Sequence, residues 1–375
     1  MIIFCCPFNT AAQSKQPKNN FLLRGIFKGR DTGIIILRYP NVNDKWQSDT
    51  AILTNGKFQF SGYLSQPSFC WLKGSSSNGN SVSFFLEPGI EHIYLEENNF
   101  DNFKMQGSFT QLQEDSLKQQ IDVAQAKYKN GLEEYTELVK KTKEITDSTA
   151  IKQMKARLLQ LSDSVVGPSN DETRDIKMAF IISHPDSYVS PTYLYSLIFN
   201  RQVQTDSAES LYSNFTGMIQ QSNTGKLIRE ELNKRRVNIE APDFFAKNDE
   251  GKNVSLQNFK GKYILLDFWA SWCQPCLKKL PGLKDLFNKY NKNGFEIITM
   301  SLDTDMDSWK KAISRNKIEK FCNLIRNEDI DNKYSNTKQP IPSEILINKK
   351  GIIVWNSLNE PSETLEQVLA KEFSY

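Results

Sequence analysis

The chain has 375 residues, a hydrophobic content of 39%, a charged content of 24% and a formal net charge of +3. This length exceeds one ordinary hydrophobic core and predicts two or three domains. The nearly balanced charge argues against nucleic acid as a partner. No run reaches the roughly 18–20 apolar residues that span a bilayer, so we expect no transmembrane segment in the mature chain.

The N-terminus has some features of an export signal. Residues 1–8 are mostly apolar, and residues 10–12 (Thr-Ala-Ala) provide small side chains like those at a signal-peptidase site. The positive charges that normally begin a signal peptide are missing. We interpret residues 1–12 as a truncated signal peptide, with a disordered cytosolic tail as the alternative.

Residues 20–107 are predicted to form an antiparallel β sandwich or barrel. Short runs rich in β-branched and aromatic residues, such as GIIILRY and SVSFFLE, alternate with turn formers and have no helix between them. The pair Asn55-Gly56 is typical of a type I′ hairpin turn, in which both residues have positive φ. Trp46 and Trp71 are candidates for a binding face, although we expect core packing of both.

Residues 108–236 are rich in Gln, Lys and Glu and carry apolar residues at helical spacing. Ser108 and Gln111 resemble a capping box at the start of the first helix. Gly167-Pro168 is expected to interrupt the helices. No motif in this segment indicates chemistry, so we predict a helical spacer.

Residues 237–375 alternate strand and helix signals. KYILLDFWA and FEIITMSL are continuous apolar runs typical of strands buried on both faces, and EILIN and IIVWNS flank a glycine-containing turn. Strand-helix-strand units followed by an antiparallel hairpin predict the mixed sheet of a thioredoxin fold. The whole chain is therefore expected to be a multidomain α+β protein.

The motif WCQPC places Cys273 and Cys276 directly after a buried strand, where a helix should begin. Residues three apart share a helix face, and unpaired N–H groups and the helix dipole stabilise a thiolate at this end. Such a cysteine can have a pKa of about 3.5–7.5 instead of about 8.5. We predict that Cys273 attacks substrate disulfides and that Cys276 resolves the mixed disulfide.

Neighbouring residues complete the predicted site. Asp267 lies on the strand before the motif, and its apolar neighbours predict a buried carboxyl that can accept the Cys276 proton. Trp269 and Trp272 are expected to wall the site. The expected substrate-binding residues are Trp272, Gln274, Pro275 and Ile341.

Half of a zinc site is the competing interpretation of the two cysteines. Zinc usually takes four ligands from two pairs. Cys70 and Cys322 are isolated and predicted to be small buried apolar side chains, and His92 and His184 lie far from the motif in sequence. We therefore expect no metal, and no cofactor besides a redox-active Cys273–Cys276 disulfide.

The segments APDFFAKNDEGKNVSL, DFWASWCQPC and IPSEILINKKG resemble the TlpA/ResA group of thioredoxin-like proteins over about 240–375. The resemblance implies that Cys273 and Cys276 are the redox pair, that Pro342 is the cis-proline, and that Asp267 is the buried acid. APDF also occurs in peroxiredoxins, but their Pro-xxx-Thr-xx-Cys setting is absent here. Lys279 stands where many relatives carry Glu, and Gln274 also departs from the usual residue, so the redox potential cannot be transferred.

The segments ILTNGKFQFSG and FFLEPG are similar to a domain of unknown function that precedes such thioredoxin modules in Bacteroidetes envelope proteins. This resemblance implies export to the periplasm or cell envelope. The expected function is a thiol-disulfide oxidoreductase that reduces protein disulfides, with dithiol or disulfide proteins as substrates and a membrane thiol reductant as a candidate electron donor. The alternative is an envelope binding protein whose N-terminal regions capture a partner or polysaccharide.

Overall fold

The computed structural model describes residues 19–74, 81–145, 147–334, 341–359 and 363–374. The chain forms two compact units, one of residues up to 180 with 186–190, the other of residues 181–185 with 191 onward. The predicted multidomain α+β class is confirmed. The predicted helical spacer is divided between the units, and the predicted signal peptide, residues 1–12, lies outside the described residues.

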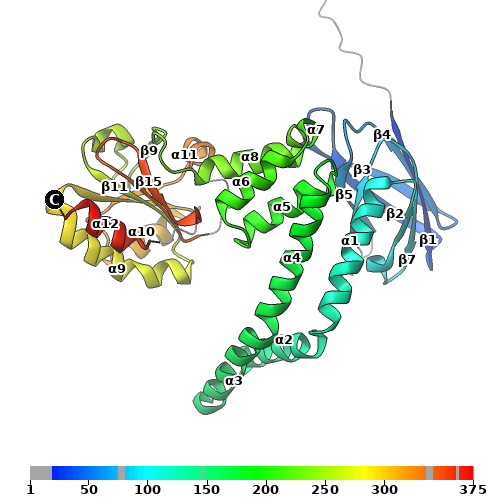
Figure 1. Ribbon diagram of the computed structural model, residues 1–375, viewed down its shortest axis with the longest axis horizontal. Helices are drawn as coiled ribbons and strands as arrows, with labels where there is room; N and C mark the ends of the chain where they lie inside the picture. Colours follow the sequence, from blue (N-terminus) through cyan, green and yellow to red (C-terminus); the bar gives the residue numbers. More distant parts are fainter. Residues whose placement is uncertain (1–18, 75–80, 146, 335–340, 360–362, 375) are drawn as a thin grey trace, which may run out of the picture. The chain divides into compact units, whose positions relative to one another are not determined.

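The first unit contains an eight-stranded sheet with the order β6-β5-β2-β3-β4-β1-β7-β8 (Figure 1). Its pairs are antiparallel except β1 and β7, which run parallel with Phe21 opposite Gly89. Parallel neighbours need a long connection, and β2 to β6 provide it here. The strands are β1 (Phe21–Lys28), β2 (Thr32–Pro40), β3 (Trp46–Thr54), β4 (Lys57–Gly62), β5 (Ser68–Gly74), β6 (Ser81–Leu86), β7 (Gly89–Glu96) and β8 (Lys104–Gln106).

Side-chain alternation along these strands builds one hydrophobic core. The predicted hairpin turn is confirmed, because Asn55 and Gly56 have φ values of 50° and 69°. Cys70 is fully buried, as predicted, and burial raises the pKa of its thiol. The expected core packing of Trp46 and Trp71 was wrong. Their side chains are 47% and 38% exposed, because they lie on the face of the strands that points away from the core.

Four helices follow the sheet: α1 (Phe109–Ala126), α2 (Lys129–Glu144), α3 (Ser148–Leu161) and α4 (Gly167–Ser183). Ser108 Oγ accepts a hydrogen bond from Gln111 N at 3.0 Å, as predicted, but Gln111 Oε1 accepts one from Phe85 N at 2.7 Å. The Gln111 side chain thus ties α1 to the sheet instead of closing the capping box. In Figure 1, α2 and α3 lie side by side, joined by the ion pair Glu134–Arg157.

The predicted interruption at Gly167-Pro168 was wrong. A π-helical turn, Ser162–Val166, joins α3 directly to α4, and the Gly167 N–H bonds to the Ser162 carbonyl. Proline in a regular α-helix clashes with the carbonyl four residues earlier. The wider π turn relieves that crowding, so the helix continues through Pro168.

The second unit joins four short helices to a thioredoxin-type domain. The helices are α5 (Val189–Phe199), α6 (Thr205–Asn214), α7 (Gly217–Gln220) and α8 (Asn223–Arg235). Buried Arg235 at the end of α8 donates to the carbonyls of Ile198 at 2.9 Å and Leu358 at 3.1 Å. Asn356 Nδ2 donates to the Lys234 carbonyl at 3.0 Å. These bonds hold α8 to the end of the second sheet.

That second sheet has the order β13-β12-β11-β14-β15, with parallel pairing of β11, β12 and β13 and antiparallel pairing of β11, β14 and β15. This is the predicted mixed sheet. A separate hairpin of β9 (Phe245–Lys247) and β10 (Asn253–Ser255) precedes this sheet. The strands of the sheet are β11 (Tyr263–Trp269), β12 (Phe295–Ser301), β13 (Cys322–Ile325), β14 (Ser343–Ile347) and β15 (Ile353–Asn356). The helices of the domain are α9 (Gln274–Tyr290), α10 (Met306–Asn316), α11 (Glu328–Lys333) and α12 (Leu365–Glu372). Within the described residues, no helix combines the length and apolar character needed to cross a bilayer.

The sheet separates two hydrophobic clusters. Leu265 and Trp269 of β11 belong to the cluster that contains residues of α9, whereas Leu266 and Phe268 belong to the cluster on the other face. Alternation along β11 therefore assigns Asp267 to the α9 face. This placement brings the carboxyl to the side of the sheet that carries the cysteine motif.

Candidate active site

Cys273 and Cys276 form a disulfide at the N-terminus of α9, with their Cα atoms 5.3 Å apart. Cys273 is the N-cap residue, and its Sγ accepts a hydrogen bond from the Cys276 N–H at 3.2 Å. Pro275 occupies the first turn, where a helix residue needs no N–H partner. Both cysteines are nearly buried, at 5% and 3% exposure. The two sulfurs are thus bonded to each other, whereas a zinc site would use them as separate ligands.

The position of Cys273 favours its thiolate once the disulfide is reduced. The first N–H groups of a helix have no partner within the helix, and the helix dipole is positive at this end. One of those groups, the Cys276 N–H, already points at Cys273 Sγ. The same contact would stabilise negative charge on this sulfur, as the attacking role predicted for Cys273 requires.

The predicted substrate-binding residues differ in exposure. Trp272 is 63% exposed, and Gln274 and Pro275 are also exposed beside the disulfide. Ile341 is partly buried and packs against the cluster that contains the cysteines. Trp269 is fully buried in that cluster and belongs to the core. Of the two tryptophans expected to wall the site, only Trp272 is available to a large substrate.

Asp267 is 3% exposed, in agreement with the burial predicted from its apolar neighbours. Burial raises the pKa of its carboxyl from 3.8 to about 8. The negative charge of Glu344 contributes to this rise in pKa, and the positive charge of Lys279 opposes it. A carboxyl with this pKa can exchange a proton with a thiol near neutral pH.

Glu344 was not predicted from the sequence. It lies on β14, two residues after Pro342, and is in register with Asp267 on β11. Its side chain is 3% exposed, and its Oε2 lies 2.6 Å from Lys279 Nζ. Lys279, which stands where many relatives carry glutamate, is thus paired with an acidic residue on β14. The sequence signal for Glu344 was a charged residue within the apolar run SEILI. All five residues of this run are buried in the structure.

Asp303, which follows β12, was also missed. Its Oδ2 accepts from Ser271 N at 2.9 Å and from Ser301 Oγ at 2.6 Å, and its Oδ1 accepts from Ser271 Oγ at 2.6 Å. Ser271 lies two residues before Cys273. These bonds therefore fix the turn that leads from β11 into the cysteine motif.

The Ile341–Pro342 peptide bond is cis, the conformation that the family resemblance implies. Arg201, in the turn after α5, donates from Nη2 to the Pro342 carbonyl at 3.4 Å. The α5–α8 segment, predicted to be a spacer without chemistry, thus contributes a side chain next to Pro342. The roles of Pro342 and of the substrate-binding residues stay predictions.

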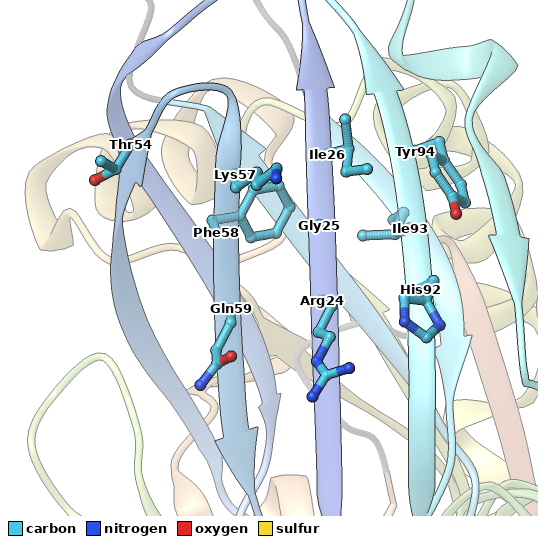
Figure 2. Close-up of a pocket in the computed structure, with 10 residues that line it drawn as sticks. All are labelled: Arg24, Gly25, Ile26, Thr54, Lys57, Phe58, Gln59, His92, Ile93 and Tyr94. Atoms are coloured by element: carbon cyan, nitrogen blue, oxygen red, sulfur yellow. The ribbon is translucent and has the colours of Figure 1, made fainter.

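A separate cavity of about 420 Å³ lies on the β domain of the first unit. Figure 2 shows Gln59, Arg24 and His92 in a row across the neighbouring strands β4, β1 and β7. Lys57 and Tyr94 also line it, and none of its lining residues belongs to the cysteine site.

Two family models match different parts of the chain. The model described as "AhpC/TSA family" matches residues 237–356, and the model described as "Domain of unknown function (DUF4369)" matches residues 21–113. The first match covers the thioredoxin-type domain with the disulfide. The second covers the β domain and the start of α1.

Curated and solved relatives resemble the C-terminal part. "Thiol-disulfide oxidoreductase ResA" of Bacillus thuringiensis subsp. konkukian (strain 97-27) is 32% identical over 148 residues, which are 39% of this chain and 83% of the relative. The thioredoxin domain of a thiol-disulfide oxidoreductase from Bacteroides vulgatus is 28% identical, with a TM-score of 0.33, and covers 37% of this chain and 99% of its own. A thiol:disulfide interchange protein from Bacteroides sp. is 29% identical, with a TM-score of 0.34, and covers 38% and 93%.

Proposed function

This chain belongs to the family of ResA-like thiol-disulfide oxidoreductases, and from that premise we propose that it reduces disulfides of other proteins in the periplasm or cell envelope. The observation that carries the proposal is the Cys273–Cys276 disulfide at the N-terminus of α9. The exposed side chains of Trp272, Gln274 and Pro275 beside it form the proposed surface for a protein substrate.

The proposed reaction uses the reduced protein. The Cys273 thiolate attacks one sulfur of a substrate disulfide, forms a mixed disulfide and releases the other substrate sulfur as a thiolate. Cys276 then gives its proton to the carboxylate of Asp267, and its thiolate attacks Cys273 Sγ. The Cys273–Cys276 disulfide forms, and the second substrate sulfur leaves as a thiolate. Two electrons have passed to the substrate, and the cysteine pair is the only redox group that this cycle requires.

Asp267 favours the reductant direction. A buried acid with a pKa of about 8 helps Cys276 attack and release the substrate. The cycle then needs a thiol donor to restore the dithiol, and we propose a membrane thiol reductant for this step. The envelope location is supported by the similarity of the N-terminal domain to domains that precede thioredoxin modules in envelope proteins.

Trapping tests this proposal. A Cys276→Ser variant keeps the attacking sulfur but cannot resolve the mixed disulfide, so it should accumulate disulfide-linked partners in cells. Non-reducing gels and mass spectrometry would identify them, and the Cys273→Ser variant is the matched control that should trap none. Equal capture by both variants would argue against the proposed chemistry.

A second candidate function is capture of an envelope polysaccharide by the β domain. The observation in its favour is an aromatic platform of Trp46, Trp71 and Phe69. The Trp46 and Trp71 ring centroids are 4.7 Å apart, those of Phe69 and Trp71 are 5.5 Å apart, and Arg38 lies 5.5 Å from the Trp46 ring. Exposed aromatic rings combine apolar faces with a polar N–H group, and clustered exposure of this kind marks binding surfaces.

If the platform binds sugars, calorimetric titration of the full chain with maltohexaose or a soluble peptidoglycan digest should show binding. The Trp46→Ala/Trp71→Ala variant should weaken binding about tenfold or more, because it removes both exposed rings. Trp272→Ala is the matched control, since Trp272 is also an exposed tryptophan but belongs to the cysteine site. Unchanged affinity in the double variant, or no response of the wild type, would count against this candidate.

A further inference from the structure

The cysteine site contains two buried carboxyl groups, and the two-cysteine cycle uses only one of them, Asp267. Asp267 on β11 and Glu344 on β14 stand directly opposite each other in an antiparallel pair. Residues paired in this way have Cβ atoms about 4.5–5.5 Å apart and point to the same face of the sheet. That face is the one of Leu265 and Leu346, whose hydrophobic cluster also contains both cysteines.

Lys279 connects this buried pair to the surface. It lies on α9 three residues after Cys276, and residues at this spacing share a helix face. Its Nζ lies 2.6 Å from Glu344 Oε2, and the Lys279 side chain is 43% exposed while that of Glu344 is 3% exposed. Glu344 Oε1 is buried and has no hydrogen-bond partner within the part of the chain that the structure describes. Glu344 is therefore held mainly by one lysine.

A buried carboxylate with an unsatisfied oxygen costs free energy. Two adjacent buried carboxylates do not ionise together easily unless a positive charge opposes them. The ammonium group of Lys279 supplies the opposing charge. Removing this group is therefore expected to affect Asp267 as well as Glu344.

We propose that Glu344 and Lys279 are positioning residues for the proton transfer from Cys276. Lys279 forms an ion pair with Glu344 and offsets its charge, so that Asp267 can lose its proton and accept the one from Cys276. This inference rests on the proposed reductase function. In the resolving step the Cys276 S–H bond breaks and its proton passes to Asp267. The sulfur electron pair forms the bond to Cys273 Sγ, and the bond between Cys273 Sγ and the substrate sulfur breaks as that sulfur leaves as a thiolate.

Because Glu344 and Lys279 carry opposite charges, we expect their replacement to shift the pKa of Asp267 in opposite directions. Burial is the main cause of its raised pKa, the charge of Glu344 raises the pKa further, and the charge of Lys279 lowers it. The residue opposite Asp267 on β12 is Thr299, which is uncharged. On the α9 side the charge that acts on the Asp267 carboxyl is that of Lys279. Neutralising Glu344 should therefore lower the pKa of Asp267, and neutralising Lys279 should raise it.

The test follows the two thiol steps separately. The reduced full chain is mixed with an aromatic disulfide that releases a coloured thiolate, once when Cys273 attacks and again when Cys276 resolves. In Glu344→Gln the pH midpoint of the second release should move down, and in Lys279→Met it should move up, with rates at pH 7.5 changed several-fold in opposite directions. Lys279→Arg should restore the wild-type midpoint.

Matched variants distinguish this role from a structural one. Lys278→Met removes the same charge from the neighbouring exposed position of α9 and should leave the second midpoint unchanged. A Cys276→Ser variant should show only the first release, and the Cys273→Ser/Cys276→Ser variant measures the background from other cysteines. If Lys279→Met does not fold, the Lys279→Met/Glu344→Gln variant replaces it, with a midpoint above that of Glu344→Gln alone.

The outcomes separate the two proposals. In one outcome the wild type releases two thiolates while the pH midpoints of the Glu344 and Lys279 variants stay unchanged or move in the same direction. Either result would refute the positioning role and leave the reductase function intact. A wild type without the second release would refute the function itself.

Discussion

Replacing Cys273 with serine is expected to abolish disulfide reduction, with a loss of about 10³-fold or more, because an alcohol is a far weaker nucleophile than a thiolate. The helix N-terminus cannot compensate, since its N–H groups stabilise an existing negative charge but do not ionise a serine. The pre-reduced variant should fail to reduce insulin disulfides, followed by the turbidity of the released chains.

Cys322→Ser is the control for this experiment. Cys322 is a free cysteine that is partly buried, less so than the sequence predicted, and burial raises the pKa of its thiol to about 12. It is therefore protonated at neutral pH and should contribute nothing to the rate. Comparable losses in the Cys273 and Cys322 variants would mean that the activity depends on general thiol content rather than on the motif.

Replacing Asp267 with asparagine is expected to slow the resolving step about 10²-fold at pH 8.5, because the proton acceptor is lost. It should also stabilise the thioredoxin-type domain at that pH. The folded protein keeps the Asp267 proton up to about pH 8, whereas the unfolded chain releases it near pH 3.8. The contribution of Asp267 to stability is therefore full below pH 3.8 and falls as pH rises to about 8, by about 6 kcal/mol.

The measurement compares the unfolding of oxidised wild type and Asp267→Asn by calorimetry between pH 4.5 and pH 8.5. The free energy of unfolding of Asp267→Asn relative to the wild type should increase with pH. Groups that titrate equally in both proteins do not contribute to this difference. Asp305→Asn is the control: Asp305 is the exposed N-cap of α10, and its hydrogen bond from Ser308 lowers its pKa, so its effect lies below this pH range. A difference for Asp267→Asn that does not vary with pH would contradict the raised pKa.

Sequence patterns predicted the parts of the site that are contiguous in the chain. The buried strand, the cysteine pair and the start of α9 follow one another directly, so local periodicity and helix-terminus chemistry were sufficient to place Cys273 and Cys276. The Asn55-Gly56 turn was also predicted from adjacent residues alone. Burial of Asp267 followed from the apolar residues on both sides of it, since such a strand is covered on both faces.

Other features depend on which segments meet in space. Trp46 and Trp71 both lie on strands, but packing decides which face of each strand points inward, and it leaves both rings exposed. The helix continues through Gly167-Pro168 because a π turn accommodates the proline, a local geometry that composition does not indicate.

The sequence by itself determined the redox chemistry of this protein, because the reacting cysteines are neighbours on one helix turn and their environment is a property of that turn. Only the tertiary structure decided which charged groups surround Asp267. The register of β11 with β14 sets Glu344 against Asp267, and the packing of α9 on the sheet brings Lys279 to Glu344. Strand register and side-chain direction arise from contacts between distant segments, and those contacts decide which charges share a buried site.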